Sequence, residues 1–262
     1  MPRNNKMSFP PLWVRVHSVW YRHYRVYTQN IVSNGLPPFL EPLIFLAGIG
    51  LGMGKYVSEM EGIPYLRFLS TGLPITAAMF TAAFECSFGT FIRLEFDKVY
   101  DGMLGAPITV HNLLIGEILW AGTKGMFFAT AVVLVVLAFG QVPATALVVA
   151  PVIGFLTGIM FAGLSLFVTS FVKTINHFNF YFTGFLSPMF FFSGVVFPVG
   201  NLPESIRPFA EIFPLTHSVR LMRRCSLGNF SPILGWDVAF IVIFTVIAGH
   251  FAIRRLSRRL IG

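Results

Sequence analysis

Three ionisable side chains lie inside long apolar stretches of the sequence, where a charge is costly and is therefore a candidate functional group. Glu85 and Glu117 lie in consecutive apolar stretches, and Lys124 follows Glu117 by seven residues on the same helical face. At the helical rise per residue, both carboxylates fall roughly 12–15 Å inside one boundary, and Lys124 about 10 Å deeper. Two carboxylates at that depth need partners, and Lys124 can pair with one of them if the helices tilt suitably.

This group has two interpretations. It is either a structural set of ion pairs and hydrogen-bonded carboxyls within a helix bundle, or it contacts a substrate or couples a conformational change. The three residues are therefore candidate intramembrane polar sites.

A second group of candidates is aromatic and lies after residue 175. Rings occur all round the helix expected there, which is typical of packing and lipid contact, but aromatic faces also stack on acyl chains and sugars. The candidates for a translocation path or an outer gate are Phe182, Phe185, Phe192, Phe197 and Pro198. Further along, three arginines lie close together in the sequence: Arg220, Arg223 and Arg224. They are interpreted as solvated groups, as partners of carboxylates or as a contact for lipid phosphate.

Machinery for hydrolysis is not apparent in the sequence. The chain has no phosphate-cradling G-x-x-x-x-G-K-[ST] loop, and Gly122-Thr123-Lys124-Gly125 is only a superficial likeness inside an apolar stretch. It also has no G-x-S-x-G, H-E-x-x-H or C-x-x-C motif. We therefore expect no catalytic, cofactor or metal site, and any work against a gradient needs energy from another polypeptide.

Composition indicates which solvent surrounds the elements that hold these residues. Of the 262 residues, 55% are hydrophobic and only 11% are charged, and the mean hydropathy is +0.73. Because soluble domains carry about a quarter charged residues, the expected fold class is all-α integral membrane. About 20 apolar residues cross a bilayer, so the sequence predicts six crossings near residues 36–54, 68–92, 111–139, 145–171, 176–198 and 232–253.

The net charge of +8 is concentrated at the two ends of the chain. Basic residues without any acid occur before residue 41 and after residue 250, namely Arg3, Lys6, Arg15, Arg22, Arg25, Arg254, Arg255, Arg258 and Arg259. Since basic residues beside spans stay in the cytoplasm, both termini are expected on the cytoplasmic side of a bacterial inner membrane. The same charges flank apolar segments of bilayer length, which argues against a nucleic-acid partner.

Two units are expected, residues 1–35 and residues 36–262. Within the first, residues 11–32 carry an apolar stripe and an arginine-bearing stripe at spacings of three and four. This pattern predicts an amphipathic helix that lies at the headgroup boundary, packs on the protein's own cytoplasmic face, or does both.

Two connections between spans are longer than turns. Residues 93–110 mix charged and apolar residues, and they predict a short cytoplasmic helix that stops between Gly102 and Pro107. Residues 199–231 predict two short helices on the outer side, with a break at Pro214 and a stop at Gly228. If the second connection dips into the leaflet, its irregular backbone must be buried in protein.

Motifs along nearly the whole chain resemble a known family. The first are Glu41-Pro42-Leu43-Ile44, Thr81-Ala82-Ala83-Phe84-Glu85, Gly116-Glu117, Trp120-Ala121 and Thr123-Lys124. The more specific ones belong to the second long connection: Phe192-Ser193-Gly194-Val195-Val196-Phe197-Pro198, Leu202-Pro203 and Pro214-Leu215-Thr216-His217-Ser218. On these motifs the chain resembles type 2 ABC transporter permeases, and within them the nodulation-protein J (NodJ) group.

The resemblance implies a six-span subunit that pairs with a second copy of itself and with two copies of a separate P-loop ATPase. That ATPase would use ATP and Mg²⁺, while this chain binds no cofactor. The amphipathic start would be the interfacial connecting helix, residues 95–106 the coupling helix, and residues 199–228 the outer re-entrant hairpin. The implied coupling residues are Glu95, Phe96, Asp97, Lys98, Tyr100 and Asp101.

NodJ-like permeases are associated with export of lipo-oligosaccharides. The resemblance therefore implies an exporter of a lipid-linked saccharide or similar amphiphile, with membrane lipid and that substrate as further partners. A drug or hydrophobic-compound exporter of the same architecture is the nearest alternative. An ion-coupled secondary transporter is more distant, because the spans are few and no internal repeat is apparent, and a membrane scaffold without transport activity is a third alternative.

Overall fold

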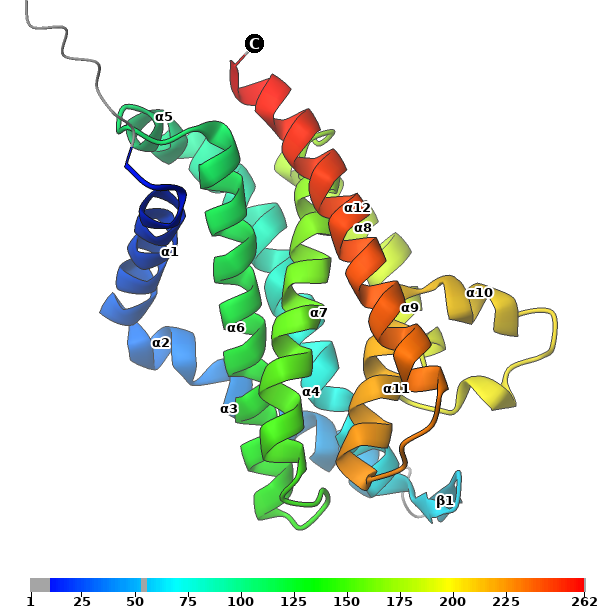
Figure 1. Cartoon of the computed structure of the whole chain (residues 1–262). Coiled ribbons are helices and arrows are strands. Elements are labelled where there is room, and N and C mark those ends of the chain that lie inside the picture. The colour runs from blue at the N-terminus through cyan, green and yellow to red at the C-terminus, as the bar shows by residue number, and fades with distance from the viewer. Residues whose placement is uncertain (1–9, 53–55, 262) are drawn as a thin grey trace, which may run out of the picture.

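The computed structural model describes residues 10–52 and 56–261. Long helices α4, α6, α7 and α12 run side by side, and α1 lies against one side of this bundle (Figure 1). The chain begins with α1 (Leu12–Gln29), α2 (Ile31–Gly35), α3 (Pro37–Phe45), the π-helical turn η1 (Leu46–Leu51), and the antiparallel pair β1 (Glu59–Met60) and β2 (Ile63–Pro64).

The central helices follow, with the π-helical turns η2 and η3 prolonging α4. Their bounds are α4 (Tyr65–Phe84), η2 (Glu85–Gly89), η3 (Ile92–Phe96), α5 (Val99–Leu104), α6 (Val110–Ala138) and α7 (Ala146–Thr169). The remaining elements are η4 (Ile175–His177), α8 (Phe178–Tyr181), the π-helical η5 (Phe182–Leu186), α9 (Ser187–Phe192), η6 (Val199–Asn201), α10 (Arg207–Ile212), α11 (Pro214–Leu227) and α12 (Ile233–Ile261).

Four helical segments in the described part of the chain are long and apolar enough to cross a membrane. They are Tyr65–Phe96, Val110–Ala138, Ala146–Thr169 and Ile233–Leu260, which correspond to the second, third, fourth and sixth expected crossings. The first expected crossing is shorter within the described residues, and the fifth is a series of short helical pieces from η4 to α9. The chain is therefore an all-α membrane protein, and the count of six remains a prediction.

Helices α6 and α7 pack with their backbones in direct contact. A Cβ on Gly158 would lie 2.8 Å from the Cα of Gly122, and one on Gly125 would lie 2.8 Å from the carbonyl oxygen of Gly154. In lipid, where no hydrophobic force drives helices together, small residues permit the close packing that holds them. This pair forms a rigid centre on which α4 and α12 also pack.

Helix α1 packs along α6, because Gly116 leaves room for it. A Cβ on Gly116 would lie 2.6 Å from Val19 Cβ, and the indole of Trp20 donates a hydrogen bond to Thr123 Oγ1 at 2.9 Å. Trp13, near the start of α1, remains 72% exposed, and Tyr21 and Tyr24 remain 47% and 43% exposed. The amphipathic helix was expected at the headgroup boundary, against the protein, or both. The structure shows it packed against the protein, and its exposed aromatic side chains remain free to contact lipid.

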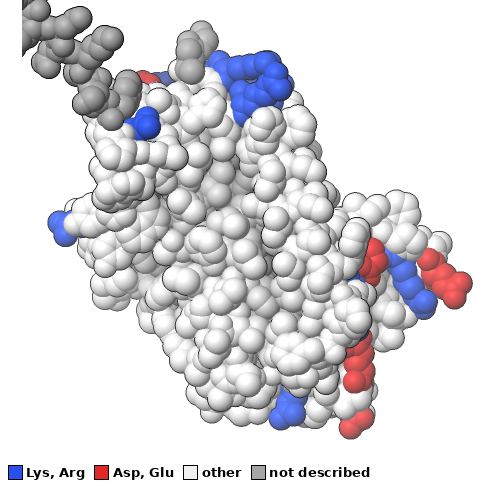
Figure 2. Space-filling model, viewed as in Figure 1, with Lys and Arg blue, Asp and Glu red and all other residues white. Residues whose placement is uncertain are grey.

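Different helices and turns lie at the two ends of the bundle. Helix α5 and the C-terminal end of α12 lie at one end, and the turn between α6 and α7 lies at the other (Figure 1). Helix α10 projects sideways from the bundle, and α11 ends at Gly228, whose φ is 74°. On the face drawn in Figure 2, charged residues gather near the α5 end and around α10 and β1, while the broad middle is uncharged.

Candidate functional site

A buried charge network joins α4, its π-helical extension and α6. Nη1 of Arg93 donates to Oε1 of Glu85 at 2.8 Å, and Nη2 donates to Oε2 of Glu117 at 2.7 Å. Lys124 Nζ lies 2.8 Å from the other oxygen of Glu85. The Glu117 side chain is fully buried, and that of Glu85 is 12% exposed. Two carboxylates thus face two cations, and this closed arrangement offsets the cost of burying charge.

The structure brings together all three candidate intramembrane residues and adds a fourth. Lys124 pairs with Glu85 rather than with Glu117 on its own helix. Arg93, which the sequence placed at the end of an apolar stretch, reaches back into the bundle and links the two carboxylates. The π-helical turn Glu85–Gly89 precedes Arg93, and a π-turn alters the direction in which the following side chains point.

Helix α5 is attached to this network through Tyr100. Its side chain is completely buried, and its hydroxyl donates to Oε1 of Glu117 at 2.8 Å. The neighbouring Phe96 is 63% exposed, and the exposed residues beside it are Asp97, Lys98 and Asp101. Of the six expected coupling residues, Tyr100 therefore points inward, whereas these four are on the surface.

Glu95, the sixth expected coupling residue, lies in η3 and connects it to the C-terminal end of α12. Its Oε1 accepts a hydrogen bond from Arg259 Nη2 at 2.7 Å, and Lys98 Nζ lies 3.9 Å from Oε2. Lys98 adopts φ 52°, which turns the chain between η3 and α5. The helix observed at Val99–Leu104 is shorter than the expected 95–106, because η3 extends the preceding helix to Phe96.

Helix α1 contributes His23 to the same network. Its Nε2 lies 2.9 Å from Oε1 of Glu117 without hydrogen-bond geometry, and its ring stacks on Trp120 at 6.1 Å between centroids. His23 lay on neither stripe of the amphipathic pattern, so the sequence did not indicate it. His23 lies one helical turn after Val19, which packs on Gly116, and this contact between α1 and α6 is seen only in the structure.

The donor atoms of His23, Glu85 and Glu117 lie within 4.8 Å of one another, which is close enough to suggest a metal centre. Arg93 and Lys124 already occupy carboxylate oxygens of both acids at ion-pair distance. A divalent cation would have to displace these fixed positive charges. We therefore interpret the cluster as ion pairs and not as a metal site.

An aromatic surface adjoins the network. Phe84 and Phe182 lie 4.3 Å apart between ring centroids, and Phe88 contacts both Phe178 and Phe182. Phe84 also lines a cavity of about 420 Å³, together with Ala77, Phe80, Thr81, Lys124 and Phe128. An apolar cavity with one ammonium at its wall suits an amphiphile better than a polar solute.

The aromatic candidates do not form one group. Phe182 belongs to the surface beside the cavity, and Phe185, 39% exposed, stacks on Tyr181 at the end of α8. Phe192 and Phe197 are half-buried and Pro198 is buried. These three flank the loop that begins where α9 ends.

A second set of charges, the arginine–carboxylate cluster, lies on α10, α11 and the start of α12. Arg220 donates to both oxygens of Glu211, at 2.8 and 2.9 Å, and to Asp237 at 2.6 Å. His217 Nδ1 lies 2.7 Å from Asp237 and its ring stacks on Phe240. Burial opposes the charge, but the hydrogen bonds to Asp237 and Glu211 raise the pKa of Arg220 above its usual range.

These features define a class of protein before any comparison. Apolar helices of bilayer length, cross-paired charges inside the bundle and a short helix tied to them from one end are the parts of a membrane transport subunit. Comparison agrees, since the ABC-2 type transporter family matches residues 15–226. The chain belongs to the ABC-2 type transporter family.

Individual relatives are similar over most of the sequence. Nodulation protein J of Sinorhizobium fredii is 34% identical over 94% of each chain, and nodulation protein J of Rhizobium meliloti is 33% identical over 93% of each chain. The inner membrane transport permease YadH of Escherichia coli is 25% identical over 90% of this chain and 93% of its own. The chain is therefore the membrane subunit of an ABC transporter in the bacterial inner membrane, which works with an ATPase and is not itself a catalytic enzyme.

Proposed function

We propose that this protein is the permease of an ATP-driven exporter that moves a lipid-linked saccharide or similar amphiphile out of the cytoplasm or inner leaflet. Two copies would pair with two copies of a P-loop ATPase, which uses ATP and Mg²⁺. Both termini and α5 would lie in the cytoplasm, and α10 and α11 on the outer side. The observation that carries the proposal is the contact from α5 through Tyr100 to the buried Glu117.

The surface of α5 supports docking of an ATPase. Asp101 is exposed on α5, and Phe96, Asp97 and Lys98 are exposed just before it, while Tyr100 fixes the inner side of the helix. An apolar ring among charges of both signs suits a polar interface that forms and separates in each cycle. These residues, with Glu95, would contact the ATPase, while Tyr100 would pass the movement inward.

The buried network supports transmission from α5 to the spans. A displacement of Tyr100 acts on Glu117 of α6, and Arg93 links Glu117 to Glu85 at the end of α4. Ion pairs at 2.7–2.8 Å between largely buried side chains resist separation. The helices α4 and α6 would therefore move with α5 as a rigid unit.

The cavity beside Lys124 supports an amphiphilic substrate. Its aromatic wall continues to Phe182, so an acyl chain or sugar face would meet rings along its course. Phe185, Phe192, Phe197 and Pro198 would extend this path toward an outer gate. One copy encloses little of a large amphiphile, which favours a path shared by two copies.

The test of the ATPase interface is charge reversal on α5. In inverted vesicles that contain the permease and its partner ATPase, Asp101→Arg should reduce co-purification of the ATPase about tenfold, as the loss of one interfacial charge contact predicts. ATP-dependent accumulation of a lipid-linked saccharide should fall with it.

Glu204→Arg is the matched control, because Glu204 is an exposed acid outside α5 that precedes α10. It should leave both the complex and transport unchanged. Equal effects of the two variants, or normal assembly with Asp101→Arg, would contradict docking at α5. If the complex assembles normally but exports a drug and no saccharide, the proposed substrate class is wrong, while docking of the ATPase at α5 is unaffected.

A further inference from the structure

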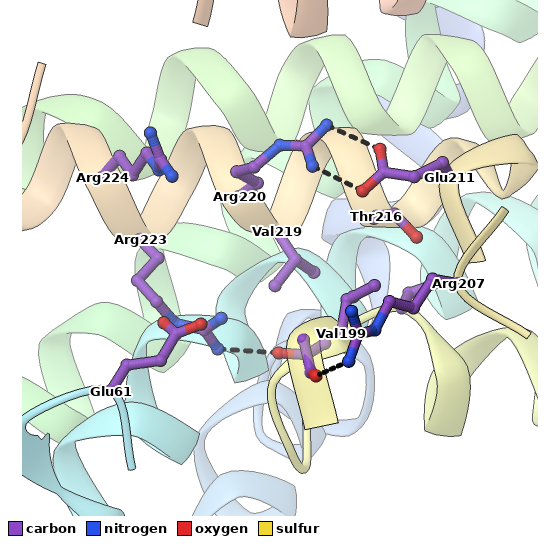
Figure 3. Close-up of a pocket in the computed structure, with 12 residues that line it drawn as sticks. Glu61, Val199, Arg207, Glu211, Thr216, Val219, Arg220, Arg223 and Arg224 are labelled. Atoms are coloured by element: carbon purple, nitrogen blue, oxygen red, sulfur yellow. Dashed lines mark hydrogen bonds and ion pairs between the residues drawn. The ribbon is translucent and has the colours of Figure 1, made fainter. Parts of the chain in front are cut away.

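A separate pocket beside the arginine–carboxylate cluster has an excess of positive charge. Its cavity measures about 280 Å³, and its lining includes four arginines and two glutamates: Arg207, Arg220, Arg223, Arg224, Glu61 and Glu211 (Figure 3). Arg220 is already committed to Glu211 and Asp237. The other three arginines have no carboxylate within 4 Å among the described residues.

Arg223 is buried and forms no ion pair within 4 Å among the described residues, although the Glu61 carboxylate lies near enough to attract it. It is 8% exposed, and its Nε and Nη2 donate to Thr71 Oγ1 at 2.9 Å and to the Gly194 carbonyl at 2.8 Å. Its guanidinium also lies 3.6 Å above the ring of Phe68. In the described part of the chain, Nη1 donates no hydrogen bond. Burial lowers the pKa of Arg223 to about 10, and the attraction of the Glu61 carboxylate offsets only part of this effect.

Ser193 is a second unsatisfied group at the same wall. Its side chain is 1% exposed and lines the cavity, and its hydroxyl has no hydrogen-bond partner within the described residues. Buried polar atoms are nearly always paired, so an unpaired hydroxyl in a cavity points to a ligand or an ordered solvent molecule. Ser193 and Arg223 meet at Gly194, which follows Ser193 and accepts from Arg223.

Arg207 approaches this loop from the other side. Its guanidinium donates to the carbonyls of Leu202 and Gly200, at 2.9 and 2.7 Å, and these bonds hold it beside Val199. In Figure 3, Arg207 and Arg223 lie on opposite sides of the loop that carries Val199, while Arg220 turns to Glu211. Two planar guanidinium groups around a polar cavity suit the oxygens of a phosphate group.

We infer that this pocket binds the phosphate of an anionic headgroup, which accepts hydrogen bonds from Arg223, Arg207 and Ser193. The cavity holds a phosphate with a small substituent and is too small for a whole amphiphile. Glu61 lines the same cavity, so its carboxylate weakens binding by repulsion. The inference rests on the proposed function only for the assignment of the pocket to the outer side.

The test is a binding titration with the full-length permease in a non-ionic detergent. The probes are dihexanoyl phosphatidic acid, inorganic phosphate and the uncharged dihexanoylglycerol, measured by calorimetry. Arg207→Gln should weaken binding of the phosphatidic acid about tenfold, because one charge-assisted hydrogen-bond donor is lost from an exposed position. Glu61→Gln should tighten binding severalfold, and dihexanoylglycerol should not bind.

Lys173→Gln is the control, since it removes an exposed positive charge at the α5 end and should have no effect. Competition by inorganic phosphate assigns the pocket to free anions, and binding of the lipid alone assigns it to headgroups. Unchanged affinity in both Arg207→Gln and Glu61→Gln, or an equal loss in Lys173→Gln, would overturn the inference. No ATPase is present, so this result is independent of the transport test.

Discussion

The buried charge network at the α5 end and the arginine-rich region at α10 and α11 use similar residues to different effect. In the first, Glu85 and Glu117 face Arg93 and Lys124, and each carboxylate is in contact with at least one cation. In the second, Arg220 is paired, but Arg223 is buried with no carboxylate within 4 Å, and Ser193 has an unpaired hydroxyl in the part of the chain described. A balanced set of charges holds helices together, whereas an unbalanced set around a cavity is able to accept an anion.

The two regions also differ in which helices their charges connect. The network connects α1, α4, α5 and α6, so a displacement of one of these is felt by the others. The arginine–carboxylate cluster joins α10, α11 and α12, which follow one another in the sequence, and Arg223 adds a bond from α11 to Thr71 of α4. Under the proposed function, we therefore expect movement to pass from α5 to the spans through the first region.

The strongest test of this contrast removes the centre of the network. Arg93→Met leaves Glu85 with Lys124 alone and Glu117 without its guanidinium, so about 3–5 kcal/mol of stability should be lost. The measurement is the midpoint of SDS-induced unfolding of the purified permease. Arg254→Met, at an exposed position of α12, should leave that midpoint unchanged. Similar midpoints for the two variants would mean that the network does not hold the helices.

A smaller effect is expected in the second region. Asp237→Asn weakens charge-assisted hydrogen bonds with Arg220 and His217, but Glu211 still neutralises Arg220. We expect a loss of about 1.5–3 kcal/mol in the same unfolding experiment. A larger loss than that of Arg93→Met would reverse the order of the two regions and make the cluster the main structural element.

Much of this arrangement could be predicted from the sequence. An apolar composition and segment lengths predicted a helical membrane protein, and charge within apolar stretches identified Glu85, Glu117 and Lys124. Proline and glycine positions predicted two helices with a break at Pro214 and a stop at Gly228, as observed in α10 and α11. These inferences succeed because desolvation and backbone geometry act locally along the chain.

The partners of those residues could not be predicted in the same way. Arg93 was taken as a boundary residue, because a 3.6-residue period does not anticipate the π-helical turn before it or the one that contains it. Tyr100 was grouped with surface residues of α5, although its hydroxyl contacts Glu117 of another helix. Such contacts depend on how helices cross, which Gly116, Gly122 and Gly158 determine by close approach.

The measurement that tests the account most directly is the number of substrate molecules exported per ATP hydrolysed in Tyr100→Phe. This change removes only the hydroxyl that joins α5 to Glu117 and keeps the exposed docking residues of α5. We predict that the ATPase binds as it does to the unmodified permease and hydrolyses ATP, while the number exported per ATP falls about tenfold, as the loss of one hydrogen bond to a charged group implies. An unchanged number, with the complex intact, would contradict transmission through Tyr100 and the buried network.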